Sequence, residues 1–137
     1  MAEVTIHVEA EVNPTESEEK IKAAINNILG NAMITIEPRE KSSLLTGEAK
    51  GQDSLIKLRN MLRSDRIRDA ARKALFRSTK GENIVFCLNR QVAFSGHVSF
   101  SEETGESPLG TIRVAIRSDS PSQLIEWLAE KSRREEG

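Results

Sequence analysis

The sequence is poor in cysteine and in aromatic residues, and it has no long hydrophobic run. Cys87 is its single cysteine, which excludes an internal disulfide and suits a reducing compartment. Four Phe, one Trp and no Tyr leave few rings that could stack on nucleobases. The apolar runs are far shorter than a membrane span, and the N-terminus lacks the basic-then-apolar pattern of a signal peptide. We therefore expect a cytoplasmic protein that contacts no membrane.

Signatures of catalysis and of metal binding are missing as well. His7 and His97 are the only histidines, and neither lies near Cys87 or a carboxylate at the spacing of zinc ligands. The chain contains no Gly-x-Ser-x-Gly elbow, Walker loop or Cys-His signature. We expect no catalytic residues, no metal and no cofactor. An enzyme acting on a phosphorylated substrate is the weakest of the alternatives that stay open.

The hydrophobic pattern that is present switches between the periods of strands and helices. Apolar and polar residues alternate over 4–12, which predicts a half-buried strand. After Ser17, acidic residues are followed by apolar residues at helical spacing, which predicts a helix that ends at Gly30. The remaining expected strands are 33–36, 44–51, 83–88, 91–100 and 109–116. The remaining expected helices are 54–62, 67–80 and 121–128, the first two separated by a break at Ser64 and Asp65.

This pattern predicts one α+β domain over residues 1–137, with a frayed tail at 131–137. The element order β-α-β-β-α-α-β-β-β-α is no regular βα alternation, so it argues against a doubly wound parallel sheet. We expect helices packed on one face of a largely antiparallel sheet. Within it, strands 83–88 and 91–100 are expected to form a hairpin around Asn89 and Arg90. These two residues either hydrogen-bond RNA or merely supply the turn and its solvated tip.

The net charge of −1 hides an uneven distribution of charge. Residues 57–80 carry nine basic and two acidic side chains, a net charge of +7. Residues 1–56 and 81–137 carry net charges of −5 and −3. One strongly cationic helical segment therefore lies between two acidic ones, and it is the main candidate for a binding surface.

Within this basic segment, Arg66, Lys73, Arg77 and Lys80 fall on one helical stripe at 100° per residue. Arginine can hold a phosphate through two hydrogen bonds, and lysine holds one as a point charge. The predicted nucleic-acid-binding residues are Arg63, Arg66, Arg68, Arg72, Lys73, Arg77, Lys80, Asn89 and Arg90. The alternative is that these cations pair with the protein's own acids, as on the ion-pair-rich surfaces of thermophile proteins.

Three stretches, taken in their order and spacing, resemble an archaeal family. They are residues 66–72 (RIRDAAR), 88–96 (LNRQVAFSG) and 107–110 (SPLG). These stretches carry a resemblance to the uncharacterised protein family two-zero-one, and the resemblance extends over almost the whole chain. The resemblance implies a fold similar to ribosomal protein L five, which docks the five-S ribosomal RNA, and an RNA-binding role. It implies no catalytic residues.

Charge and resemblance together predict a non-catalytic RNA-binding or ribosome-associated protein, with RNA as its partner. A contact of this kind is expected to be largely electrostatic and poorly specific for sequence. The second interpretation is a protein-interaction scaffold or homodimer, in which the basic helix docks an acidic surface such as the first strand of another copy.

Overall fold

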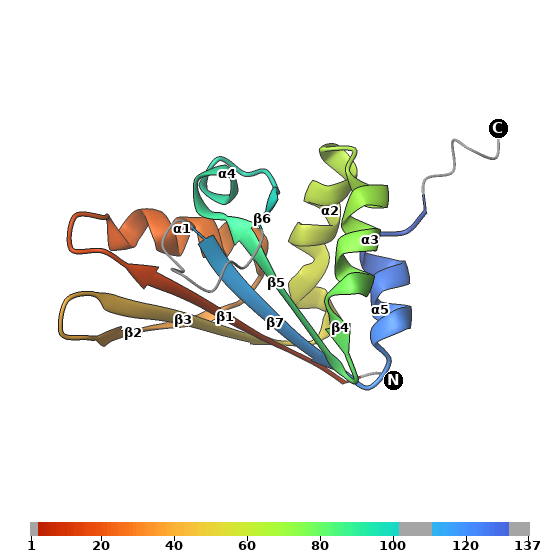
Figure 1. Cartoon of the computed structure of the whole chain (residues 1–137), viewed down its shortest axis with the longest axis horizontal. Helices are drawn as coiled ribbons and strands as arrows, with labels where there is room; N and C mark the ends of the chain where they lie inside the picture. Colours follow the sequence, from red (N-terminus) through yellow and green to blue (C-terminus); the bar gives the residue numbers. More distant parts are fainter. Residues whose placement is uncertain (1–2, 102–110, 132–137) are drawn as a thin grey trace.

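The computed structural model describes residues 3–101 and 111–131, and it confirms an α+β fold with helices on one face of an antiparallel sheet (Figure 1). The strands are β1 (Val4–Val12), β2 (Met33–Pro38), β3 (Ser43–Lys50), β4 (Thr79–Lys80), β5 (Asn83–Asn89), β6 (Phe100–Ser101) and β7 (Thr111–Ser118). The helices are α1 (Glu18–Ile28), η1 (Gln52–Leu55), α2 (Ile56–Ser64), α3 (Arg68–Arg77), α4 (Arg90–Phe94) and α5 (Pro121–Leu128). The stretch 107–110 and the tail from residue 132 lie outside the described residues.

The sheet has the order β2-β3-β1-β7-β5-β4, with antiparallel pairing throughout, and β6 pairs with β5. The alternation expected for the first strand is confirmed. Val8 is fully buried and lies opposite Gly47 and Val114, whereas His7 and Glu9 are partly exposed. Because partners in an antiparallel pair point to the same side, one face of the sheet forms the core and the other carries polar residues.

Two groups of helices cover the buried face, α1 and α4 at one end and α2, α3 and α5 at the other (Figure 1). Helix α1 begins at Ser17, whose side chain accepts a hydrogen bond from the backbone N–H of Lys20. It packs closely on the sheet at Gly47, where a Cβ atom would meet the Ile25 side chain at 3.4 Å. The predicted order of elements is confirmed, with η1, β4 and α4 as additions.

The prediction of a hairpin turn at Asn89 and Arg90 is wrong. Strand β5 pairs with β7, and residues 90–94 form α4 in place of the long strand predicted at 91–100. The side chain of Asn89 accepts a hydrogen bond from the N–H of Val92, so it starts a helix where a hairpin turn was expected. Asn27 of α1 donates to the carbonyls of Ala93 and Phe94, which ties the new helix to the first one. Only the short β6 remains of the expected strand, and it keeps the expected antiparallel pairing with β5, at Leu88 and Phe100.

Candidate nucleic-acid interface

The basic segment forms two consecutive helices, as the break at Ser64 and Asp65 predicted. Helix α2 ends at Ser64, and Arg66 adopts a φ of 59°, a left-handed conformation that a helix cannot continue through. The carboxylate of Asp65 accepts the backbone N–H of Val98 at 3.0 Å and contacts His97 Nδ1 at 2.9 Å. This turn is therefore fixed to the segment between α4 and β6.

Because of this turn, the four cations expected on one helical stripe do not all lie on the same helix. Only Lys73 and Arg77 belong to α3, one helical turn apart, whereas Arg66 lies in the preceding turn and Lys80 in β4. A helical wheel therefore does not relate all four, and the prediction of one continuous helical stripe is wrong. All four side chains are nevertheless exposed, and among the described residues none of them has an ion-pair partner. We call these four the free cations of the basic segment; Lys57 also lacks an ion-pair partner among the described residues, but it donates a hydrogen bond to the carbonyl of Asn26 at 2.8 Å.

The other arginines of the segment are held by acids of α5 and of the residues that follow it. Three guanidinium groups surround the carboxylate of Glu130, at 3.8, 3.4 and 3.5 Å, from Arg59, Arg63 and Arg68 respectively. Arg72 donates two hydrogen bonds to Glu126, and this contact raises the pKa of the arginine and lowers that of the glutamate. Internal pairing thus accounts for the arginines on this side, and it leaves the free cations unneutralised.

Arg90 is not available to a nucleic acid. Its side chain is 6% exposed, and it donates to both carboxylate oxygens of Glu16 and to the carbonyl of Thr111. The burial contradicts the prediction of an RNA contact at this residue. Asn89 uses its side-chain oxygen to cap α4, so it too has a structural role. Sequence alone did not reveal this pair, because Glu16 lies 74 residues away from Arg90.

Two carboxylates in these contacts have lowered pKa values. Burial opposes ionisation of Glu16, but the Asn13 amide and the Arg90 guanidinium outweigh it and hold its pKa below the ordinary value. Burial likewise opposes ionisation of Asp65, and hydrogen bonds from His97 and the Val98 amide outweigh it, so this pKa is also lowered. A carboxylate with a lowered folded-state pKa stabilises the fold above its unfolded-state pKa. That stability is lost as the pH falls through the folded-state pKa.

We therefore expect the free energy of unfolding to decline from about pH 5 downward. Glu16→Gln and Asp65→Asn should each lower stability at pH 7 and flatten this decline, because the substituted side chain no longer takes up a proton. Urea unfolding followed by circular dichroism between pH 3 and pH 7 measures both effects. Glu37→Gln is the matched control, since Glu37 is exposed and, among the residues that the structure describes, pairs with Arg39 alone, at 3.5 Å. An acid decline that stays as steep in both test variants as in this control would contradict the assignment.

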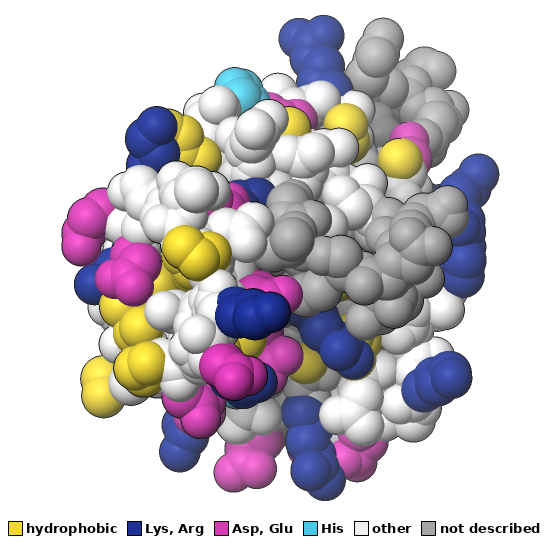
Figure 2. Space-filling model, turned by 60° about the vertical axis from the view of Figure 1, so that its left-hand side comes forward, with side chains coloured by type: hydrophobic (Ala, Val, Ile, Leu, Met, Phe, Trp, Pro, Cys, Tyr) yellow, Lys and Arg dark blue, Asp and Glu magenta, His cyan; other side chains and the backbone are white. Residues whose placement is uncertain are grey.

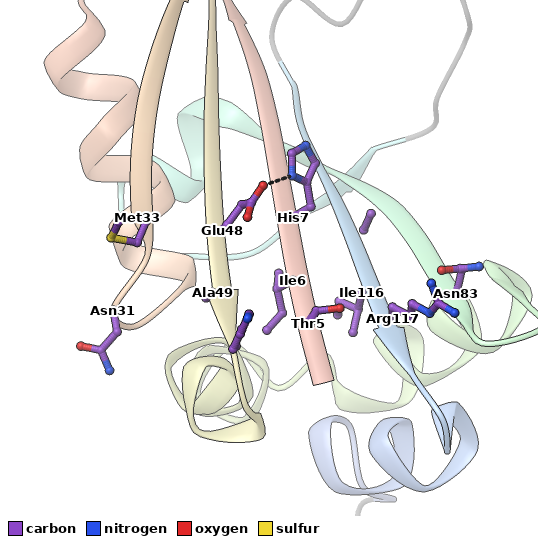
Figure 3. Close-up of a pocket in the computed structure, with 12 residues that line it drawn as sticks. Thr5, Ile6, His7, Asn31, Met33, Glu48, Ala49, Asn83, Ile116 and Arg117 are labelled. Carbon is purple, nitrogen blue, oxygen red and sulfur yellow. Dashed lines mark ion pairs between the residues drawn. The ribbon is translucent and has the colours of Figure 1, made fainter. Parts of the chain in front are cut away.

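The open face of the sheet holds a second group of polar residues that sequence reasoning missed. The register places Lys50, Thr5, Arg117, Asn83 and Lys80 directly opposite one another on successive strands. Figure 3 shows Thr5, Arg117 and Asn83 in line across this face, where a trough of about 660 Å³ is formed. Arg117 lies 3.6 Å from Glu82, and His7 pairs with Glu48 beside it. Lys80, one of the free cations, ends this row but does not line the trough. Because the charges that line the trough are largely balanced, it is a weaker anion site than the free cations.

The side of the molecule at α1 and the β2–β3 hairpin has a different charge pattern. Figure 2 shows basic and acidic side chains intermixed on this side. The first turn of α1 contains Glu18 and Glu19. Lys22 lies beside Glu19, and Arg39 lies beside Glu37. Because acids surround them, the cations on this side serve as a control set for the free cations when the effect of charge on binding is tested.

The described part of the chain offers few other kinds of site. Among residues 3–101 and 111–131, no group of three His, Cys, Asp or Glu side chains is arranged to hold a metal ion. No helix in this part is both long and apolar enough to span a membrane. Cys87 is buried in β5.

Comparison with known proteins connects this geometry to a family. A family model described as RNA binding matches residues 5–118. A UPF0201 protein of Sulfolobus acidocaldarius is 42% identical, over 91% of this chain and 86% of its own length. A UPF0201 protein of Aeropyrum pernix is 38% identical, over 92% of this chain and 85% of its own. The crystal structure of a UPF0201 protein from Methanococcus jannaschii is similar with a TM-score of 0.81 and 32% identity, covering 93% of this chain and 94% of that one.

Proposed function

The chain belongs to the UPF0201 family, and on that premise we propose that it is a non-catalytic RNA-binding protein. The free cations Arg66, Lys73, Arg77 and Lys80 supply its phosphate contacts. One observation carries the proposal. These four exposed side chains keep their charge unneutralised within the described residues, although Glu126 of α5 and Glu130 after it engage the neighbouring arginines.

The physical argument is electrostatic. A phosphate that binds a lysine or arginine releases condensed counterions, so a cluster of unpaired cations gains affinity for a polyanion. Lys73 and Arg77 are one helical turn apart on α3, and the other two lie just before and just after that helix. Phosphates along a chain can therefore reach several of these cations at once. The family model is described as RNA binding, and this description supports RNA as the polyanion that the chain binds.

A salt series tests this proposal directly. Filter binding of the whole chain to an RNA with paired and unpaired segments should give a log affinity that falls linearly with log salt. Four phosphate contacts predict a slope of about −2.8, taking about 0.7 for each contact with single-stranded RNA. A flat dependence on salt, or no binding at low salt, would rule the proposal out.

The competing interpretation is a scaffold in which the same cations dock the acidic first strand of a second copy. Sedimentation of the protein alone at low and high salt separates the two. Self-association that disappears at high salt, without affinity for RNA, would favour the scaffold. A role on the ribosome and the likeness to ribosomal protein L five stay predictions from the resemblance.

A further inference from the structure

An exposed aromatic ring lies among the free cations. Phe76 is 38% exposed on α3, and the residues that α3 buries in the core are Ala71 and Leu75. Lys73 precedes it by three residues, a spacing that puts the two side chains next to each other on the helix surface. Arg77 follows it directly and is exposed as well. A large apolar side chain thus stays in water at the most cationic part of the molecule.

The ring of Phe76 is held in place by its own surroundings. The guanidinium of Arg72 lies over it, 5.3 Å from the ring centroid. Arg72 is itself fixed, because it donates two hydrogen bonds to Glu126 of α5. The ring is therefore supported by a group that is tied to another helix, and ordering it on binding costs little conformational entropy.

We propose that Phe76 stacks on an unpaired nucleobase of RNA while Lys73 and Arg77 hold the neighbouring phosphates. This inference rests on the proposed function and goes further by naming the bound form, an RNA segment with unstacked bases. A base in a duplex is already stacked and is not available to the ring, whereas a base in a loop or a single strand is. Stacking on aromatic side chains tolerates any base, so the contact adds affinity without selecting a sequence.

Phe94 shows why exposure of a ring is not enough. It is 44% exposed and also has a cation over its ring, with Lys20 Nζ 5.8 Å from the centroid. Its hollow, however, is lined by Glu16 and lies beside the first turn of α1, which carries Glu18 and Glu19. Lys20 and Arg90 line the same hollow, so acids and bases are balanced there and no excess of unpaired cations surrounds the ring. The two phenylalanines therefore form a matched pair that differs mainly in the charge around the ring.

The test compares Phe76→Leu and Phe94→Leu in the whole chain. Affinity is measured for an RNA hairpin with an unpaired loop and for a fully paired RNA of the same length. Phe76→Leu should weaken binding to the loop RNA by about 5- to 100-fold and leave binding to the paired RNA unchanged. Phe94→Leu should bind both as the unaltered protein does. Phe76→Trp should restore loop binding, because an indole ring stacks at least as well.

A spectroscopic readout separates stacking from a general loss of structure. The fluorescence of 2-aminopurine placed in the loop should be quenched by the protein and by Phe76→Trp, and not by Phe76→Leu. Equal affinity of Phe76→Leu and the unaltered protein for the loop RNA would overturn the stacking contact and leave RNA binding intact. Equal losses for both RNAs would overturn it too. No RNA binding by the unaltered protein would overturn the proposed function along with it.

Discussion

Replacing Arg90 with methionine is expected to lower the free energy of unfolding by about 3 kcal/mol, the low end of the range for breaking a buried ion pair. The substitution keeps an apolar side chain of similar reach but leaves the Glu16 carboxylate without its partner. The hydrogen bond to the carbonyl of Thr111 is lost as well. The low end applies because Glu16 is still 30% exposed and water can solvate part of its charge. The Nε atom of Arg90 is also buried without a partner among the described residues, a cost that methionine removes.

Arg117→Met is the matched control for this prediction. Arg117 is also an arginine in an ion pair, with Glu82 at 3.6 Å, but its side chain is 71% exposed. Surface pairs contribute about 0–1 kcal/mol, so this variant should unfold almost like the unaltered protein. Urea unfolding at pH 7 measures both. Similar stability losses in the two variants would show that burial of the Arg90 pair does not matter.

A double variant sharpens the assignment of this pair. Arg90→Met combined with Glu16→Gln removes both charges, so no buried carboxylate is left uncompensated. We expect the double variant to be more stable than the sum of the two single losses predicts, with a coupling of about 1–3 kcal/mol. Purely additive losses would mean that the two side chains stabilise the fold independently.

Neutralising the free cations is expected to reduce RNA affinity by about two to three orders of magnitude at 0.1 M salt. Each phosphate contact contributes about 0.7 decades at that salt concentration, through the release of counterions. Glutamine is the suitable replacement because it keeps the side-chain length and favours helices about as well as lysine does. The variant carries Arg66→Gln, Lys73→Gln, Arg77→Gln and Lys80→Gln. Its salt dependence should become nearly flat.

The control for this variant changes the net charge by the same amount on the other side of the molecule. It carries Lys20→Gln, Lys22→Gln, Arg39→Gln and Lys41→Gln, around α1 and the β2–β3 hairpin, where charges of both signs are intermixed (Figure 2). If net charge alone attracted RNA, both variants would lose affinity equally. If the free cations make the contacts, the control keeps most of its affinity and its salt slope. Equal losses in the two would place the binding surface elsewhere.

Most of the fold could be predicted because its signals are local. The alternation in β1 and the N-terminal cap of α1 involve residues within a few positions of one another. The break between α2 and α3 at Asp65 is a local signal of the same kind. The prediction failed at residues 91–100, where the apolar run Val92, Ala93 and Phe94 fits a strand as well as a helix. The choice of helix depends on the Asn89 cap and on the contact with Asn27 of α1, and the second of these is distant in the sequence.

For the candidate site, the sequence by itself determined that one segment carries a net charge of +7 and that it forms two helices. Local composition and periodicity contain that information. Only the tertiary structure decided which of these cations are free. The partners of the neutralised arginines, Glu126 and Glu130, come from α5 and the residues after it. Glu126 lies 54 residues after Arg72, and Glu130 lies 67 residues after Arg63. Pairing of charges depends on distance in space, so an arginine engaged by α5 and one exposed to RNA look the same until the helices are packed.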